Sequence, residues 1–292
     1  MKLVFLFPLL FLLVQCTAKK FHQDITFAGG KYVTTDHLNL GYRVYTNNCS
    51  ACHGHQGDGN GVAAKGLFPP PRNFTLGIYK FSKSLAGELP DDETFGEIIT
   101  KGLHGTAMLP WAIQGESLDA VIQYIKTFAP KVWNDPKKEL GKRVNIGTDP
   151  FSGAQVSGLE LGKKVYHVKA NCQMCHRAYE LKKDISLWNK EVNGEEISDF
   201  DSNLYELKPQ SFEDKGKAIP PDFTYHSVRS AQNVSEIAHR IAAGVGGAAM
   251  PSWKDTITDE EIWGLAYYVK ELMNVGMDAK KRDALMNKLS KQ

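Results

Sequence analysis

The apolar residues of this 292-residue chain form one continuous run and two helical stripes. The run extends from Leu3 to Val14 and directly follows Lys2. The stripes recur at intervals of three and four residues, which places their side chains on one face of an amphipathic helix. They consist of Leu118, Val121, Ile122, Ile125 and Phe128 in the first half and of Ile262, Leu265, Ala266 and Val269 in the second. The pattern therefore predicts a helix at the end of each half.

The N-terminal run has the form of an export signal. About a dozen apolar residues behind a lysine are too few to span a bilayer, which needs roughly 20. The run ends at Leu13-Val14-Gln15-Cys16, which resembles a bacterial lipoprotein box with Gln15 in place of the usual small residue. This resemblance implies lipidation of Cys16, and cleavage after Ala18 is the alternative. Residues 1–18 are expected to be a lipoprotein-type signal peptide, and either route exports the chain.

The composition is that of a soluble globular protein. Hydrophobic residues make up 42% and charged residues 23%, which argues against wholesale disorder and against a polytopic membrane protein. The formal net charge is only +2, so the chain lacks the strong basic field of nucleic-acid-binding proteins, and no nucleic-acid partner is expected.

Four of the five cysteines lie in two identical motifs, Cys49–His53 and Cys172–His176, each of the form Cys-x-x-Cys-His. Two thiols at this spacing reach the two vinyl groups on one edge of a porphyrin, and the next residue then lies beneath the iron. A zinc site needs four ligands in a compact set, whereas these pairs are about 120 residues apart. A disulfide would not explain the histidine in both motifs. The motifs predict two covalently bound haem c groups, with thioethers to Cys49, Cys52, Cys172 and Cys175 and with His53 and His176 as axial ligands.

The sequence repeats itself around these motifs. A glycine, a methionine six positions later and a tryptophan three positions further recur as Gly102, Met108, Trp111 and as Gly244, Met250, Trp253. Such self-similarity indicates two copies of one unit, each with its own core. Because methionine sulfur completes the coordination of a histidine-bound haem iron, the repeated frame predicts Met108 and Met250 as the other axial ligands.

Together these features resemble the class I c-type cytochromes, arranged as a tandem di-haem protein. The resemblance runs from about residue 30 to 275, and the first half is similar to the cytochrome c domains of bacterial respiratory complexes. It implies a mainly α fold with two tandem class I cytochrome c-like helical haem domains joined by a linker. It also implies that a proline carbonyl, from Pro69–Pro71 in the first half and from Pro220–Pro221 in the second, accepts the Nδ1 proton of the axial histidine.

The repeat sets the expected domain limits. We expect a first cytochrome c domain at 24–130, a linker at 131–156, a second domain at 157–276 and a C-terminal tail at 277–292. In the second half Arg177 replaces the glycine that follows the first motif, and 44 residues separate His176 from Pro220, against 17 between His53 and Pro70. The inserted stretch at about 180–215 is expected to be a solvated surface loop, with a partner-docking loop or a small site as alternatives.

Three further side chains have two interpretations each. Trp111 and Trp253 are expected to pack near the haem, where an indole N–H either donates to a propionate or simply fills the core. Arg72 either pairs with a propionate or is exposed.

An iron with two protein ligands has no position for a substrate and can only exchange one electron. The sequence therefore predicts an electron-transfer protein, not an enzyme: a di-haem c-type cytochrome that carries single electrons in a respiratory chain. The expected partners are a membrane respiratory complex or an exported oxidoreductase. The expected location is the periplasm, with a lipid anchor at Cys16 in a bacterial membrane. The alternative is a di-haem cytochrome c peroxidase, which needs one iron with an openable sixth position; a gas sensor needs the same.

Overall fold

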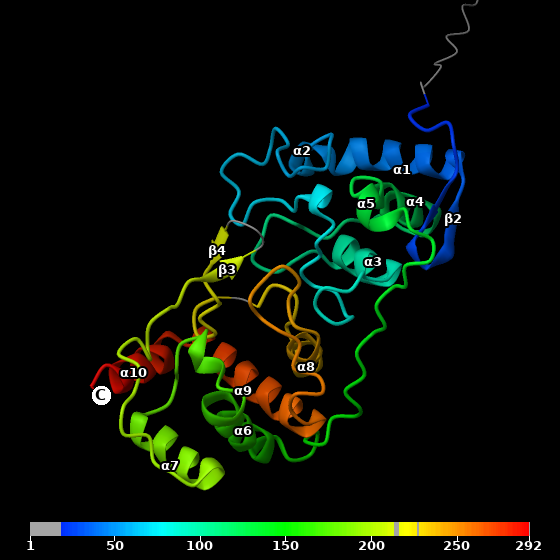
Figure 1. Ribbon diagram of the computed structural model, residues 1–292. Coiled ribbons are helices and arrows are strands. Elements are labelled where there is room, and N and C mark those ends of the chain that lie inside the picture. Colours follow the sequence, from blue (N-terminus) through cyan, green and yellow to red (C-terminus); the bar gives the residue numbers. More distant parts are fainter. Residues whose placement is uncertain (1–18, 213–215, 227, 292) are drawn as a thin grey trace, which may run out of the picture.

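The computed structural model describes residues 19–212, 216–226 and 228–291, so the predicted signal peptide and Cys16 lie outside the described residues. The described part of the chain is mainly helical, as predicted, and it also contains two short antiparallel strand pairs. The two halves lie one above the other in Figure 1, and an extended segment after α5 connects them along one side. None of the helices in the described ranges has both the length and the apolar character that a membrane crossing requires.

The two halves contain similar elements. The first half consists of β1 (Ile25–Phe27), η1 (Ala28–Gly30), β2 (Lys31–Val33), α1 (Thr35–Asn48), α2 (Ser50–His53), η2 (Phe74–Leu76), α3 (Asp92–Lys101), α4 (Gly115–Lys126) and α5 (Pro130–Trp133). The second consists of α6 (Gln155–Lys164), η3 (Val165–Lys169), η4 (Cys172–Met174), α7 (Lys182–Asn193), β3 (Gln210–Phe212), β4 (Gly216–Ala218), α8 (Val234–Ala243), α9 (Asp259–Met277) and α10 (Ala279–Leu289).

Both predicted amphipathic helices are confirmed, as α4 and α9. Helix α4 ends at Lys126, so Phe128 lies just beyond it and still packs against the first core. Helix α9 begins at a capping box, in which the Thr258 side chain accepts from the Glu261 N–H and the Glu261 carboxylate accepts from the Thr258 N–H.

The first helix of each half crosses the long amphipathic helix of that half at a glycine. Helix α1 packs across α4 and α6 packs across α9. A Cβ added at Gly41 would collide with the Ala120 carbonyl, and one added at Gly162 would collide with the Gly264 carbonyl. The backbones therefore approach more closely than a side chain would permit, which explains the glycine that precedes each Cys-x-x-Cys-His motif at the same place in the repeat.

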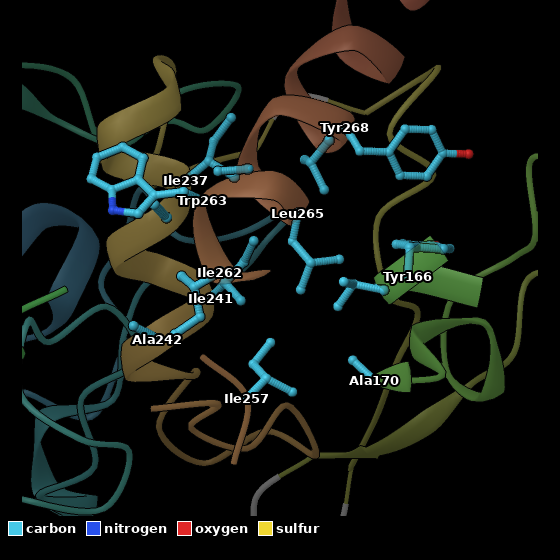
Figure 2. Close-up of a cluster of buried hydrophobic side chains, with 14 of the residues drawn as sticks. Tyr166, Ala170, Ile237, Ile241, Ala242, Ile257, Ile262, Trp263, Leu265 and Tyr268 are labelled. Carbon is cyan, nitrogen blue, oxygen red and sulfur yellow. The ribbon is translucent and has the colours of Figure 1, made fainter. Parts of the chain in front are cut away.

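Each half has its own hydrophobic core. The first core includes Phe27, Leu38, Tyr45, Val121 and Tyr124, all fully buried. In the second core, α9 supplies Leu265, and Figure 2 shows this side chain and that of Ile257 directed toward the interior between α9 and η3.

The inserted stretch is more ordered than the predicted solvated loop. It contains helix α7 and the hairpin of β3 and β4, with Gln210 opposite Ala218. Ile185 of α7 packs with Ala178 and Leu204 in a small core of its own. The sequence does contain a helical signal here, because Leu181, Ile185, Trp188 and Val192 follow one another at intervals of four, three and four residues.

The segment between the domains also differs from a bare linker. Trp133, Val144 and Ile146 are buried, and Trp133 belongs to the first core whereas Val144 and Ile146 belong to the second. The Trp263 indole N–H donates to the Ile146 carbonyl at 3.0 Å. The C-terminal tail forms α10, capped by Asp278. The domain limits drawn from the sequence stay predictions.

Candidate haem-binding sites

Each Cys-x-x-Cys-His motif follows the first helical segment of its half, directly after α1 in the first half and shortly after α6 and η3 in the second. Cys49 follows α1 directly and α2 carries the rest of the motif, while Cys172 opens η4. The four motif cysteines have free thiols. Burial raises the pKa of Cys49 to about 11 and that of Cys172 to about 12, so both thiols are protonated at neutral pH in the polypeptide alone.

The axial histidine candidates are held through Nδ1. His53 Nδ1 lies 3.0 Å from the Arg72 carbonyl, and His176 Nδ1 lies 3.4 Å from the Pro221 carbonyl. A donated Nδ1–H leaves the lone pair on Nε2, the tautomer that binds a metal. Burial lowers the pKa of both imidazoles, that of His176 to about 4, which keeps them neutral.

The expected proline acceptor is confirmed in the second half and wrong in the first. There the acceptor is Arg72, the residue after the prolines. The Pro71 carbonyl faces Gly59 instead, where an added Cβ would lie 2.7 Å from it. In the first half the Pro71 carbonyl therefore packs against Gly59, and the carbonyl one residue further on faces His53.

The rings of both histidines stack on the same residue of the repeat. Phe74 lies 4.6 Å from His53 and Phe223 lies 5.0 Å from His176, measured between ring centroids, and both interplanar angles are 21°. A buried tyrosine also donates to the carbonyl that follows each motif: Tyr45 to Gly54 at 2.8 Å and Tyr166 to Arg177 at 2.9 Å. Each imidazole is thus fixed before any metal is considered.

The methionine candidates lie on loops that close in the same way. Gly102 and Gly244 end α3 and α8 with φ of 69° and 75°, values that favour glycine. The Leu103 N–H then donates to the Met108 carbonyl at 2.8 Å, and the Val245 N–H donates to the Met250 carbonyl at 3.1 Å.

The tryptophan of the repeated frame ties each loop back to its helix. The Trp111 N–H donates to Ile99 at 3.0 Å, and the Trp253 N–H donates to Ile241 at 3.3 Å. Trp253 packs against the second core, whereas Trp111 is 38% exposed. The repeated frame therefore encodes one loop geometry, with a half-buried methionine in each copy.

The donor set fits haem c. Each half offers two free thiols, one imidazole with an available Nε2 and one thioether on a closed loop. Ligation by His53, His176, Met108 and Met250, and thioether formation by the four cysteines, stay predictions.

The two methionine loops also join the domains, which the sequence did not reveal. The His104 N–H of the first loop donates to the Arg229 carbonyl at 3.0 Å, and the Gly246 N–H of the second donates to the Lys80 carbonyl at 3.1 Å. His104 and Gly246 each come two residues after the helix-ending glycine, and Lys80 and Arg229 each come six residues after the stacked phenylalanine. These two hydrogen bonds of the domain interface are therefore related by an approximate two-fold symmetry.

Arg240 of α8 extends this interface on one side only. Its guanidinium donates to the carbonyls of Phe81 at 2.9 Å, Ser82 at 2.8 Å and Gly244 at 3.0 Å, and to the Ser230 hydroxyl at 3.0 Å. Desolvation lowers its pKa to about 10. Four hydrogen bonds with neutral acceptors therefore hold a buried charge between the domains.

The fold and the repeated sites define a tandem c-type cytochrome. The model of the family described as cytochrome c oxidase, cbb3-type, subunit III matches residues 36–125 and 159–269, and the chain belongs to this family. Proteins of this class bind haem c covalently and use it in electron transfer, and the same holds for this chain.

A solved structure resembles both halves at once. The chain is similar to a chain of the Kuenenia stuttgartiensis reducing HAO-like protein complex Kustc0457/Kustc0458. The two are 29% identical with a TM-score of 0.62, over 80% of this chain and 95% of the other. No curated protein matches this sequence.

Proposed function

We propose that this protein is an exported di-haem c-type cytochrome that carries single electrons between redox partners. The observation that carries the proposal is the matched geometry of the two halves: in each, Nδ1 of the motif histidine is engaged by a backbone carbonyl and a closed loop presents a methionine. The bound haem supplies one-electron chemistry between ferric and ferrous iron.

The residues of this chain supply orientation and exclusion of water. His53 and His176 are held in the same way. Each donates from Nδ1 to a backbone carbonyl, stacks on a phenylalanine and leaves Nε2 for the metal. Met108 and Met250 would supply the second protein ligand of each iron, which would raise the reduction potential and leave no place for a substrate. This arrangement supports a carrier and disfavours a peroxidase.

We further propose that electrons pass between the halves across the domain interface. His104 and Gly246, each four residues before its methionine, make the hydrogen bonds that join the domains. Each methionine loop bonds to the segment that follows the stacked phenylalanine of the other half, and these bonds hold the two sites at one separation and orientation. The rate of electron exchange between two centres depends steeply on their separation.

The partner proposed for this carrier is a redox protein at the outer face of a bacterial membrane. The likeness to a chain of a reducing HAO-like protein complex supports an oxidoreductase that binds this chain, and the family match supports a respiratory complex. The export signal and Cys16 support periplasmic location with a lipid anchor.

The test uses the purified holoprotein. A haem assay should give two haem c groups per chain. The weak methionine–iron absorption in the far red should fall to about half its intensity in each of the two single variants, Met108→Ala and Met250→Ala. Replacement of Met277, an exposed methionine outside both motifs, is the matched control. Retention of the full absorption in either ligand variant, or rapid turnover of peroxide by the native protein, would contradict the proposal.

A further inference from the structure

The two halves fix the axial histidine by different means. In the first half a backbone group holds the stacked phenylalanine, because the Phe74 N–H donates to the Gly57 carbonyl of the glycine turn at 2.7 Å. The second half lacks this turn, and there the Phe223 N–H donates to the Tyr179 hydroxyl at 2.8 Å. A tyrosine side chain has thus taken the place of a backbone carbonyl.

The residue before each phenylalanine differs in charge but not in local geometry. Asn73 Oδ1 accepts from the Thr75 N–H at 2.9 Å and from its hydroxyl at 2.7 Å, and Asp222 Oδ1 accepts from the Thr224 N–H and hydroxyl at the same distances. The repeat therefore places a neutral amide in one half and a carboxylate in the other.

The carboxylate of Asp222 is buried and fully hydrogen-bonded. Besides the two bonds from Thr224, Oδ1 accepts from the Tyr179 hydroxyl at 3.1 Å and Oδ2 accepts from Arg177 Nη1 at 2.8 Å. Asp222 is 6% exposed. Burial acts to raise its pKa, but the bonds from Thr224 and Arg177 outweigh burial and hold the pKa below the usual value, so the group is ionised.

This charge is coupled to the axial histidine through one peptide unit. The carbonyl that lies against His176 Nδ1 belongs to Pro221, the residue directly before Asp222. Arg177, which binds Asp222, directly follows His176. The Arg177–Asp222 ion pair thus connects the residue after His176 to the residue after Pro221, whose carbonyl faces the His176 ring.

We propose that Arg177, Tyr179 and Asp222 are the positioning residues for the axial histidine of the second haem, and that the Asp222 carboxylate lowers the reduction potential of that haem. This inference rests on the proposed haem at the second site. Oxidised haem carries one more positive charge than reduced haem, so a nearby carboxylate favours the oxidised form. An isosteric amide removes this negative charge and so leaves the Arg177 charge uncompensated, which raises the potential.

The first experiment is a redox titration of the full-length holoprotein with Asp222→Asn. It is done in a Met108→His background, which moves the first haem to a lower potential and leaves the second resolved. The reduction potential of the second haem should rise. The expected change in its equilibrium constant for one-electron reduction is about tenfold, which equals 59 mV. An unchanged second potential, with two haems bound and the Met250 absorption intact, would overturn the inference.

The first half provides the mirror test, which stands even if the Asp222 variant fails to fold. Asn73→Asp keeps the acceptor for Thr75 and adds a carboxylate where Gly54 offers no cation to pair with it. The potential of the first haem should fall while that of the second stays constant. A constant potential of the first haem would show that a charge at this position does not affect the haem, and would equally overturn the inference.

The positioning role has a separate readout. Tyr179→Phe removes both the acceptor for the Phe223 N–H and the donor to Asp222, so the proton resonances of the second haem that report the orientation of its axial imidazole should shift. Tyr205→Phe is the matched control, because its hydroxyl donates to the Glu180 carbonyl and not to this network. Equal spectra for the two variants would refute the positioning role. Loss of the second haem from the native protein itself would instead refute the proposed function.

Discussion

The guanidinium of Arg240 donates to the Phe81 carbonyl at 2.9 Å and so joins helix α8 of the second domain to the backbone of the first. It donates to the neighbouring Ser82 carbonyl as well. No carboxylate takes part, so this contact depends on geometry and not on charge pairing.

Replacement of Arg240 by methionine should loosen the domain interface. The apolar stem is retained, but buried carbonyls lose their donor, at a cost of about 3 kcal/mol in the free energy of unfolding. In hydrogen exchange, the Ala86 and Gly246 amides, which donate to Ala243 and Lys80 across the interface, should exchange faster. Arg43→Met, on the exposed side of α1, is the control and should change neither. Unaltered protection in the Arg240 variant would show that the interface does not need it.

Gly162→Ala should destabilise the second domain although alanine favours helices by about 1 kcal/mol. The added Cβ collides with the Gly264 carbonyl, and we expect a net loss of about 2 kcal/mol as α6 moves away from α9. Denaturant unfolding measures the change. Gly96→Ala in α3 is the matched control, because its Cβ would have ordinary contacts with Leu118 at 3.6 Å, and it should leave stability equal or higher. Equal stability of the two variants would contradict the close helix crossing.

Gly244→Ala should weaken the methionine loop of the second half. The residue has φ of 75°, and an added Cβ would lie 2.6 Å from the Pro251 carbonyl carbon. Gly194→Ala, at the end of α7, has φ of 86° and open space around the Cβ, so it measures the backbone strain alone, about 1 kcal/mol.

The difference between these two variants reports the collision together with the greater backbone strain at Gly244, whose ψ of -165° lies outside the left-handed helical region that Gly194 occupies. Only Gly244→Ala should also reduce the far-red methionine–iron absorption, because the loop that carries Met250 must shift. An absorption unchanged in both variants would count against the loop geometry.

Asp222 should make the second domain sensitive to acid. Its folded pKa lies below the unfolded value of 3.8, so its contribution to stability is complete above about pH 4 and is lost as the pH falls through the folded pKa. The free energy of unfolding of the native protein and of Asp222→Asn should therefore differ at pH 6 and converge as the pH falls toward 3. A constant difference across this range would contradict an ionised Asp222.

The sequence predicted the features that have a local cause. Leu118 and Val121 lie on α4 because three- and four-residue spacing is a property of the helix itself. Gly102 and Met108 were recognisable because the same frame occurs twice, and the structure shows that the frame encodes a helix end and a closed loop.

Other features depend on where distant segments meet. The carbonyl that faces His53 belongs to Arg72 and not to one of the prolines, and no pattern in the sequence specifies this. The domain interface was missed for the same reason, since the N–H of Gly246 and the carbonyl of Lys80 are backbone groups that every residue has. The Arg177–Asp222 pair could have been noticed in the sequence, because alignment of the two halves places the charged Asp222 opposite the neutral Asn73.

Approximate two-fold symmetry within one chain has an evolutionary consequence. In a homodimer every substitution at the contact appears twice and must suit both copies. Once two copies are fused, each can change independently: the position four residues before the helix-ending glycine is Ile98 in one domain and Arg240 in the other. Covalent linkage thus permits a lopsided contact that an assembly of identical subunits could not have.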